Sequence, residues 1–157
     1  MQIVTKKGFS FIELMIVIAI AGIMTAVSLV SMSAARQKRD VEIAAREVAT
    51  AVREAQSYAL TGKNLKTKTT DCKFIFTWES SSYKVSDCKD QSYSLKNNVT
   101  FYDGNKSLSF DVPFANITSA VPFPIDIDLI KGSTGYHYHV CIYESGIVNE
   151  QLSSCTP

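Results

Sequence analysis

The sequence has no proline between Phe9 and Thr61 and no cysteine before Cys72. Because proline interrupts helices more strongly than any other residue, its absence permits one continuous helix over this stretch. The formal net charge is only +1, so the composition indicates neither a strongly basic surface for nucleic acid nor an acidic tail. No internal repeat is visible, and the length leaves room for one modest domain.

Enzyme signatures are also missing. The chain has no Gly-x-Ser-x-Gly, no phosphate-binding glycine loop, no dinucleotide fingerprint and no Cys-x-x-Cys. Its two histidines, His137 and His139, fall in one predicted strand, where we expect a surface or partly buried pair without a metal. We expect Asp126 and Asp128 to form a solvated face. The sequence therefore predicts no enzymatic activity, no cofactor and no metal, and an anchored enzyme of another type is left as an alternative.

The most informative feature that is present is the junction between a short basic leader and an apolar run that reaches about Met32. One carboxylate, Glu13, lies near the start of this run, and an acid in a bilayer centre costs about 2.5–3.5 kcal/mol. Cleavage after Gly8 would give Phe9 a free α-amine. Glu13 lies four residues further on and shares its helix face. The two charges could then neutralise each other, within one chain or between neighbours.

The segment Gly8-Phe9-Ser10-Phe11-Ile12-Glu13-Leu14 resembles the type III signal of type IV prepilins and type II secretion pseudopilins. The resemblance implies that a prepilin peptidase cuts after Gly8 and N-methylates Phe9. It also implies that Glu13 sets the register during assembly with other pilins in a helical filament. Two alternatives are a secretory signal peptide cleaved near Ser33-Ala34-Ala35 and a plain single-pass anchor.

Two groups of basic residues flank the apolar run. Lys6 and Lys7 favour a cytoplasmic N-terminus, whereas Arg36, Lys38 and Arg39 at the other end oppose a simple positive-inside count. We predict a single-pass protein of the inner membrane whose head is periplasmic or extracellular and is incorporated into a pilus or pseudopilus.

All four cysteines lie beyond the apolar run, which is typical of disulfides in a small non-cytoplasmic domain. Three connectivities are possible. We favour Cys72–Cys88 and Cys141–Cys155, each closing a loop of roughly 15 residues and contributing about 3 kcal/mol. Free buried thiols are the alternative.

The helical pattern continues beyond the apolar run. A stripe of small apolar residues, with charged residues off it, recurs at steps of three and four; its members are Val41, Ala45, Val48, Val52, Ala55 and Ala59. Gly62 is a natural stop. The chain thus divides into a leader (1–8), a transmembrane or assembly half of the helix (9–35), an amphipathic half (36–61) and a β-rich head (62–157).

In the head the apolar period shifts towards two, which predicts strands. The predicted strands begin with 74–78, 83–85, 99–102 and 108–112 and continue with 125–130, 136–143 and a short 145–148. The expected fold is α+β, with an antiparallel β head packed on the long helix as in type IV pilins.

The segments 45–59, 108–111 and 138–146 resemble the GspH/FimT-type subgroup of minor pilins and pseudopilins. Some members of that subgroup bind DNA through Gly-Arg-x-Arg, where this chain has Gly146-Ile147-Val148-Asn149-Glu150. DNA binding through this turn is therefore doubtful. Lys63, Lys66 and Lys68 form either a weak phosphate-binding edge or a solvated loop.

Val30 occupies the place where many major pilins have a helix-bending proline, which favours a minor pilin or pseudopilin. The predicted function is therefore that of a structural subunit of a type IV pilus, a type II secretion pseudopilus or a competence filament. The alternative is a filament-tip module that binds DNA or a surface.

Overall fold

A computed structural model describes residues 10–62, 74–87, 90–112, 114–132 and 135–156, the side chains of residues 27–31 and 87 apart. Within these residues the chain forms one long helix, α1 (Phe11–Thr61), followed by nine strands, β1 to β9. By its contacts it divides into two compact units, Met1–Arg36 and Gln37–Pro157. The second unit therefore contains both the C-terminal half of α1 and the strands, and we call it the head unit.

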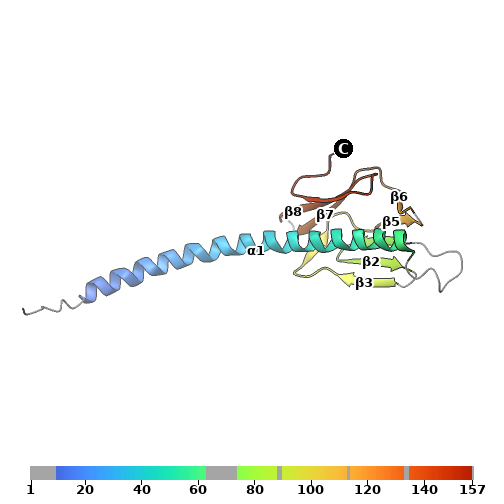
Figure 1. Ribbon diagram of the computed structural model, residues 1–157. Helices are drawn as coiled ribbons and strands as arrows, with labels where there is room; N and C mark the ends of the chain where they lie inside the picture. The colour runs from blue at the N-terminus through green and yellow to red at the C-terminus, as the bar shows by residue number, and fades with distance from the viewer. Residues whose placement is uncertain (1–9, 63–73, 88–89, 113, 133–134, 157) are drawn as a thin grey trace, which may run out of the picture. The chain divides into compact units, whose positions relative to one another are not determined.

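The strands of the head unit form two antiparallel sheets (Figure 1). The five-stranded sheet has the order β3 (Asp90–Ser94), β2 (Ser82–Asp87), β1 (Phe74–Glu79), β5 (Lys106–Asp111) and β6 (Asn116–Ser119). The four-stranded sheet has the order β4 (Val99–Phe101), β7 (Ile125–Lys131), β8 (His137–Ile142) and β9 (Val148–Gln151). The predicted α+β class, a helix with antiparallel sheets, is confirmed.

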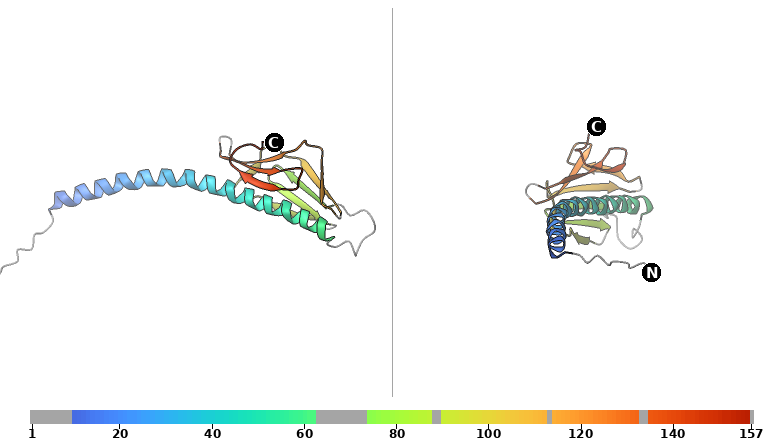
Figure 2. Two further views of the ribbon diagram at one scale, coloured as in Figure 1. Left: turned by 45° about the horizontal axis from the view of Figure 1, so that its top comes forward. Right: turned by 90° about the vertical axis from the view of Figure 1, so that its left-hand side faces the viewer.

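One core joins the helix to both sheets. Every residue of the predicted helix stripe is at most 1% exposed, and Figure 2 shows the C-terminal half of α1, coloured cyan to green, against the strands. Small side chains on the helix let the backbone approach the sheets, and large strand residues fill the space between them. The largest fully buried ones are Trp78, Phe74, Phe76, Phe110, Leu108, Ile125, Ile127, Leu129 and Ile142.

Polar contacts fix the helix on the sheets. Nζ of Lys131 in β7 donates a hydrogen bond to Asp40 of α1. Further along the helix, Arg53 donates to the carbonyl of Val148 at 2.7 Å and lies 3.0 Å from the Glu150 carboxylate of β9. The helix ends at Thr61, and Gly62 takes a positive φ of 60°, as expected for a glycine that terminates a helix. The predicted stop is confirmed.

Two strands were not predicted, and one was misplaced. All five residues of β3 are exposed, and β6 alternates only between exposed and half-buried residues. Both are edge strands with little apolar alternation, so the hydrophobic pattern gave no signal for them. The strand predicted at 145–148 begins only at Val148, because Ser145 and Gly146 form the preceding turn and Gly146 has a φ of 83°.

Candidate functional site

The first turn of α1 carries the one acidic residue of the apolar segment. The amide groups of Glu13 and Leu14 donate to the carbonyl of Ser10 at 3.1 and 3.3 Å, so the helix starts directly after Ser10. Glu13 is exposed and lies at the positive end of the helix dipole, where a carboxylate is favourable. Gly8 and Phe9, the predicted cleavage and methylation positions, lie outside the described residues.

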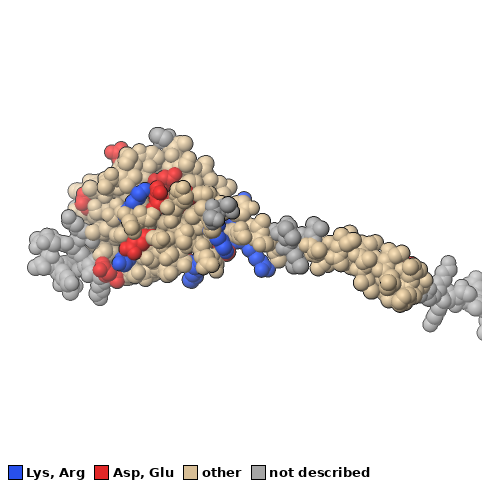
Figure 3. Space-filling model, turned by 180° about the vertical axis from the view of Figure 1, so that it is seen from behind, with Lys and Arg blue, Asp and Glu red and all other residues tan. Residues whose placement is uncertain are grey.

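The apolar residues that follow are exposed on every side of the helix. From Phe11 to Ala26 each side chain is exposed, with values of 77% for Phe11 and 69% for Ile23. No charged residue occurs between Leu14 and Ala35, and in Figure 3 this segment is tan wherever it is described, while charges of both signs dot the head unit. A helix that is apolar all round requires an apolar environment or protein partners to cover it.

Within the parts of the chain that the structure describes, no helix meets the combined criteria of length and hydropathy for crossing a membrane.

The histidines and aspartates of β7 and β8 are paired with one another. The strand register places Asp128 opposite His139 and Asp126 opposite Cys141. Nδ1 of His137 lies 2.8 Å from Asp128, and Nδ1 of His139 lies 2.9 Å from Asp126. The expected solvated face of Asp126 and Asp128 is therefore wrong, since both carboxylates are half-buried and bonded to imidazoles. No group of three or more metal-binding side chains occurs among the described residues.

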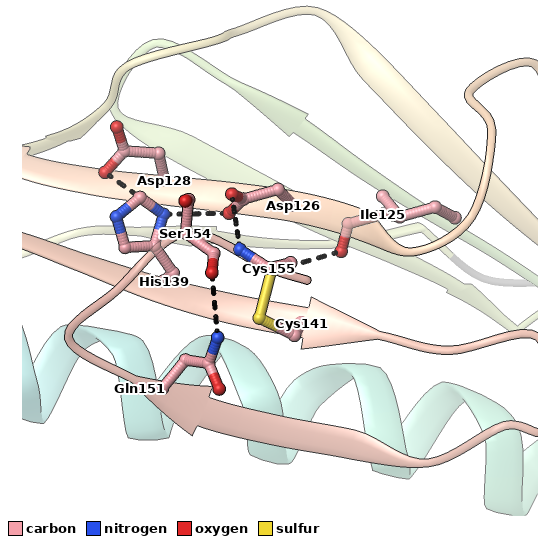
Figure 4. Close-up of a disulfide and its surroundings, with 8 residues drawn as sticks. All are labelled: Ile125, Asp126, Asp128, His139, Cys141, Gln151, Ser154 and Cys155. Carbon is pink, nitrogen blue, oxygen red and sulfur yellow. Dashed lines mark hydrogen bonds and ion pairs between the residues drawn. A yellow bond between two sulfur atoms is a disulfide. The ribbon is translucent and has the colours of Figure 1, made fainter. Parts of the chain in front are cut away.

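A disulfide between Cys141 and Cys155 closes the C-terminal segment onto β8 (Figure 4). The amide of Cys155 donates to Asp126 at 3.1 Å, so the same carboxylate holds both His139 and the disulfide segment. This pairing is one of the two that the sequence predicts. Cys72 and Cys88 lie outside the described residues, and their pairing stays a prediction.

The turn after β8 presents no cation. Ile147 is exposed, Val148 is buried, and Glu150 is bound to Arg53. The two places of the subgroup's arginines hold Ile147 and Asn149. The acid that follows them, Glu150, has an ion pair with Arg53 of the helix, which the sequence alone could not reveal. Lys63, Lys66 and Lys68, the other candidate phosphate contacts, lie outside the described residues.

Comparison with protein families gives one match. Residues 4–29 match the family model for the prokaryotic N-terminal methylation motif. Neither the curated proteins nor the solved structures include a significant match to this chain. The match includes the predicted cleavage position and Glu13 and supports a type IV pilin-like precursor.

Proposed function

We propose that the protein is a minor pilin or pseudopilin, a structural subunit of a type IV pilus, a type II secretion pseudopilus or a competence filament. The observation that carries the proposal is the methylation-motif match over residues 4–29, together with the exposed apolar helix that begins there. Filament subunits use such a helix twice, first in lipid and then in a bundle of neighbouring helices. We further propose that the protein is not an enzyme and that its role is mechanical.

The proposed mechanism begins with prepilin peptidase, which cleaves after Gly8 and methylates the new amine of Phe9. Before assembly the helix lies in the inner membrane, with its N-terminus in the cytoplasm and the head unit outside. Glu13 then gains the Phe9 amine of a neighbouring subunit as its partner. An acid in hydrocarbon costs several kcal/mol unless it is paired, so this contact favours one register of helix against helix.

The head unit supports a non-cytoplasmic location. The Cys141–Cys155 disulfide is stable where thiols are oxidised, as in the periplasm and outside the cell. The segments that resemble the GspH/FimT-type subgroup are found in the second half of α1, in β5 and in β8 with its following turn. We propose membership of this subgroup. We give DNA no part in the function, because the turn that would bind it has no arginine and is followed by the acidic Glu150.

The decisive experiment compares intact mass and filament incorporation of the wild-type chain with those of Glu13→Ala, in cells that supply the assembly system. We expect the wild type to lose residues 1–8 and gain one methyl group. Glu13→Ala should be cleaved normally and should be at least about tenfold depleted from filaments, because its amine partner loses a neutralising charge worth more than about 1.4 kcal/mol.

Two variants control this experiment. Gly8→Ala should remain as the uncleaved precursor in the membrane fraction, and Glu144→Ala, which removes an exposed carboxylate of the head unit, should be cleaved and incorporated like the wild type. Normal incorporation of Glu13→Ala would contradict the register role. An intact mass that corresponds to a chain beginning near Ala35 would instead identify an ordinary signal peptide.

A further inference from the structure

A groove of about 370 Å³ opens on the head unit between the helix and strands β2 and β3. The helix side is one flank of α1 between Arg46 and Glu54, and the strand side is formed by Tyr83 and Tyr93. The remaining lining residues are Glu47, Thr50 and Ala51. The groove is separate from the N-terminal motif on which the proposed function rests.

The two tyrosines form a fixed aromatic wall. Tyr83 and Tyr93 are cross-strand partners, and their rings stack with centroids 5.2 Å apart. Tyr83 also contacts Phe76 of the core, with ring centroids 5.7 Å apart, and its hydroxyl donates to Glu47 at 3.1 Å. Tyr83 is only 3% exposed, whereas Tyr93 at the end of the row is 38% exposed. The wall therefore presents an aromatic surface without needing to rearrange.

The groove contains two carboxylates that could bind a cation. Glu47 and Glu54 accept hydrogen bonds from the hydroxyls of Tyr83 and Tyr58, but among the described residues neither carboxylate has a cationic partner. Arg46, the basic residue of the lining, is bound to Glu42 at 2.6 Å. Burial, followed by the charge of Glu47, raises the pKa of Tyr83 well above its usual range, so this tyrosine stays neutral beside the carboxylate.

Strand β3 is an edge of the five-stranded sheet, and among the strands that the structure describes it pairs with β2 alone. Its five residues are exposed, and such an edge is where an extended segment of another chain can add as a strand. Tyr93 belongs both to this edge and to the groove wall. A strand added beside β3 would thus carry its side chains past the mouth of the groove.

We propose that the groove binds an arginine side chain of a partner protein segment that adds as a strand to β3. A guanidinium is planar, stacks on tyrosine and bonds carboxylates, so it matches both walls. The main chain of the segment would pair with Asp90–Ser94, and the guanidinium would lie between Tyr93 and the carboxylates of Glu47 and Glu54. This surface lies on the head unit and needs no contribution from the apolar helix.

The test uses the full chain in detergent micelles, with ¹³C-labelled tyrosine rings and ¹⁵N-labelled amides. The probe is an acetylated and amidated five-residue peptide of alternating threonine and valine with a central arginine. We expect saturable shifts of the Tyr83 and Tyr93 ring signals and of the β3 amides, while the amides of the opposite edge, β6, stay in place. A peptide with citrulline, the neutral isostere of arginine, should bind at least about fivefold more weakly.

Variants assign the groove. Glu47→Gln with Glu54→Gln should weaken the arginine peptide at least about fivefold, since glutamine still accepts the tyrosine hydrogen bonds but removes both charges. Tyr93→Leu, an exposed change that leaves the core intact, should weaken it as well. The matched control Glu144→Gln, on the turn after β8, should bind like the wild type.

Three results would overturn the proposal. The first is equal binding of the arginine and citrulline peptides, and the second is unchanged binding by the double glutamine variant. The third is binding of putrescine or acetyl-arginine amide as tightly as the peptide with the β3 amides unmoved, which would identify a small free cation as the occupant. A failure of Glu13→Ala to affect filaments would leave these titrations unchanged, so the two proposals fail separately.

Discussion

The two halves of α1 use the same backbone in opposite ways. Val17 in the first half is 58% exposed and Val48 in the second half is fully buried, although both are valines in regular helix. The first half is apolar all round, whereas the second half confines its apolar residues to one stripe. The comparison shows that a helix with one apolar stripe can bury that stripe in its own domain. A helix that is apolar all round needs lipid or other chains to cover it.

The largest effect is expected when a charge is placed on the buried stripe of the second half. Val48→Asp places a carboxylate among fully buried side chains, and an unpaired buried charge costs several kcal/mol. We expect a loss of at least about 3 kcal/mol in the unfolding free energy of the head unit. The near-ultraviolet circular dichroism of Trp78, the single tryptophan, would measure it during urea unfolding in micelles.

The control for Val48→Asp is Ile43→Asp, a change on the same half of the helix at a side chain that is 60% exposed. It should shift stability by no more than about 0.5 kcal/mol. Similar losses from both variants would show that the helix, and not the stripe, is the weak point.

The second test removes the Cys141–Cys155 disulfide of the head unit. Replacing Cys141 and Cys155 by serine opens a loop with a sequence separation of 14, so the head unit should lose about 3 kcal/mol. The far-ultraviolet helix signal in micelles should fall only at denaturant concentrations that unfold the head unit. A loss of helix in the absence of denaturant would mean that the disulfide supports α1 as well.

The sequence was sufficient to predict those elements in which buried residues recur at a regular short spacing. The alternation in 74–78 and 125–130 predicted β1 and β7, because one face of each strand is buried. The helix stripe and the Gly62 stop were predicted for the same local reason. Strands β3 and β6 could not be predicted, since both lie at sheet edges and bury little.

The candidate sites divide in the same way. The position of Glu13 in the first turn of a helix follows from local sequence. The pairing of Asp126 with His139 and of Asp128 with His137 depends on the register between β7 and β8, which only the folded chain determines. The groove at Tyr83 and Tyr93 was missed because it requires β3, the strand that the hydrophobic pattern does not reveal.

A third, smaller effect is a pH dependence that belongs to the head unit alone. The pKa of Tyr83 is raised, first by burial and then by Glu47, so folding favours its neutral form. This contribution is complete below the unfolded pKa of about 10 and is lost as the pH rises above it, by at most about 1.4 kcal/mol per pH unit. Tyr83→Phe should flatten the stability profile between pH 10 and 12.

The control for this profile is Tyr102→Phe, which removes a hydroxyl from a side chain that is 66% exposed. It should leave the alkaline slope unchanged. If both variants keep the wild-type slope, other groups cause the alkaline loss of stability.

The smallest effect concerns the polar side of the helix. Arg53 reaches across to β9, where it donates to the carbonyl of Val148 and lies 3.0 Å from Glu150, whereas Arg46 binds Glu42 within the helix. Both pairs are partly exposed, so each should contribute only about 0.5 kcal/mol.

A double-mutant cycle with Arg53→Met and Glu150→Gln, measured by the unfolding of the head unit, gives the coupling energy between the helix and β9. The corresponding cycle with Arg46→Met and Glu42→Gln measures a contact inside one element. If a contact inside the helix is weaker than one between the helix and a strand, raising the salt concentration should remove most of the second coupling. Part of the first should persist, because the side chains of Arg53 and Glu150 are less exposed than those of Arg46 and Glu42, and salt screens a less exposed pair less.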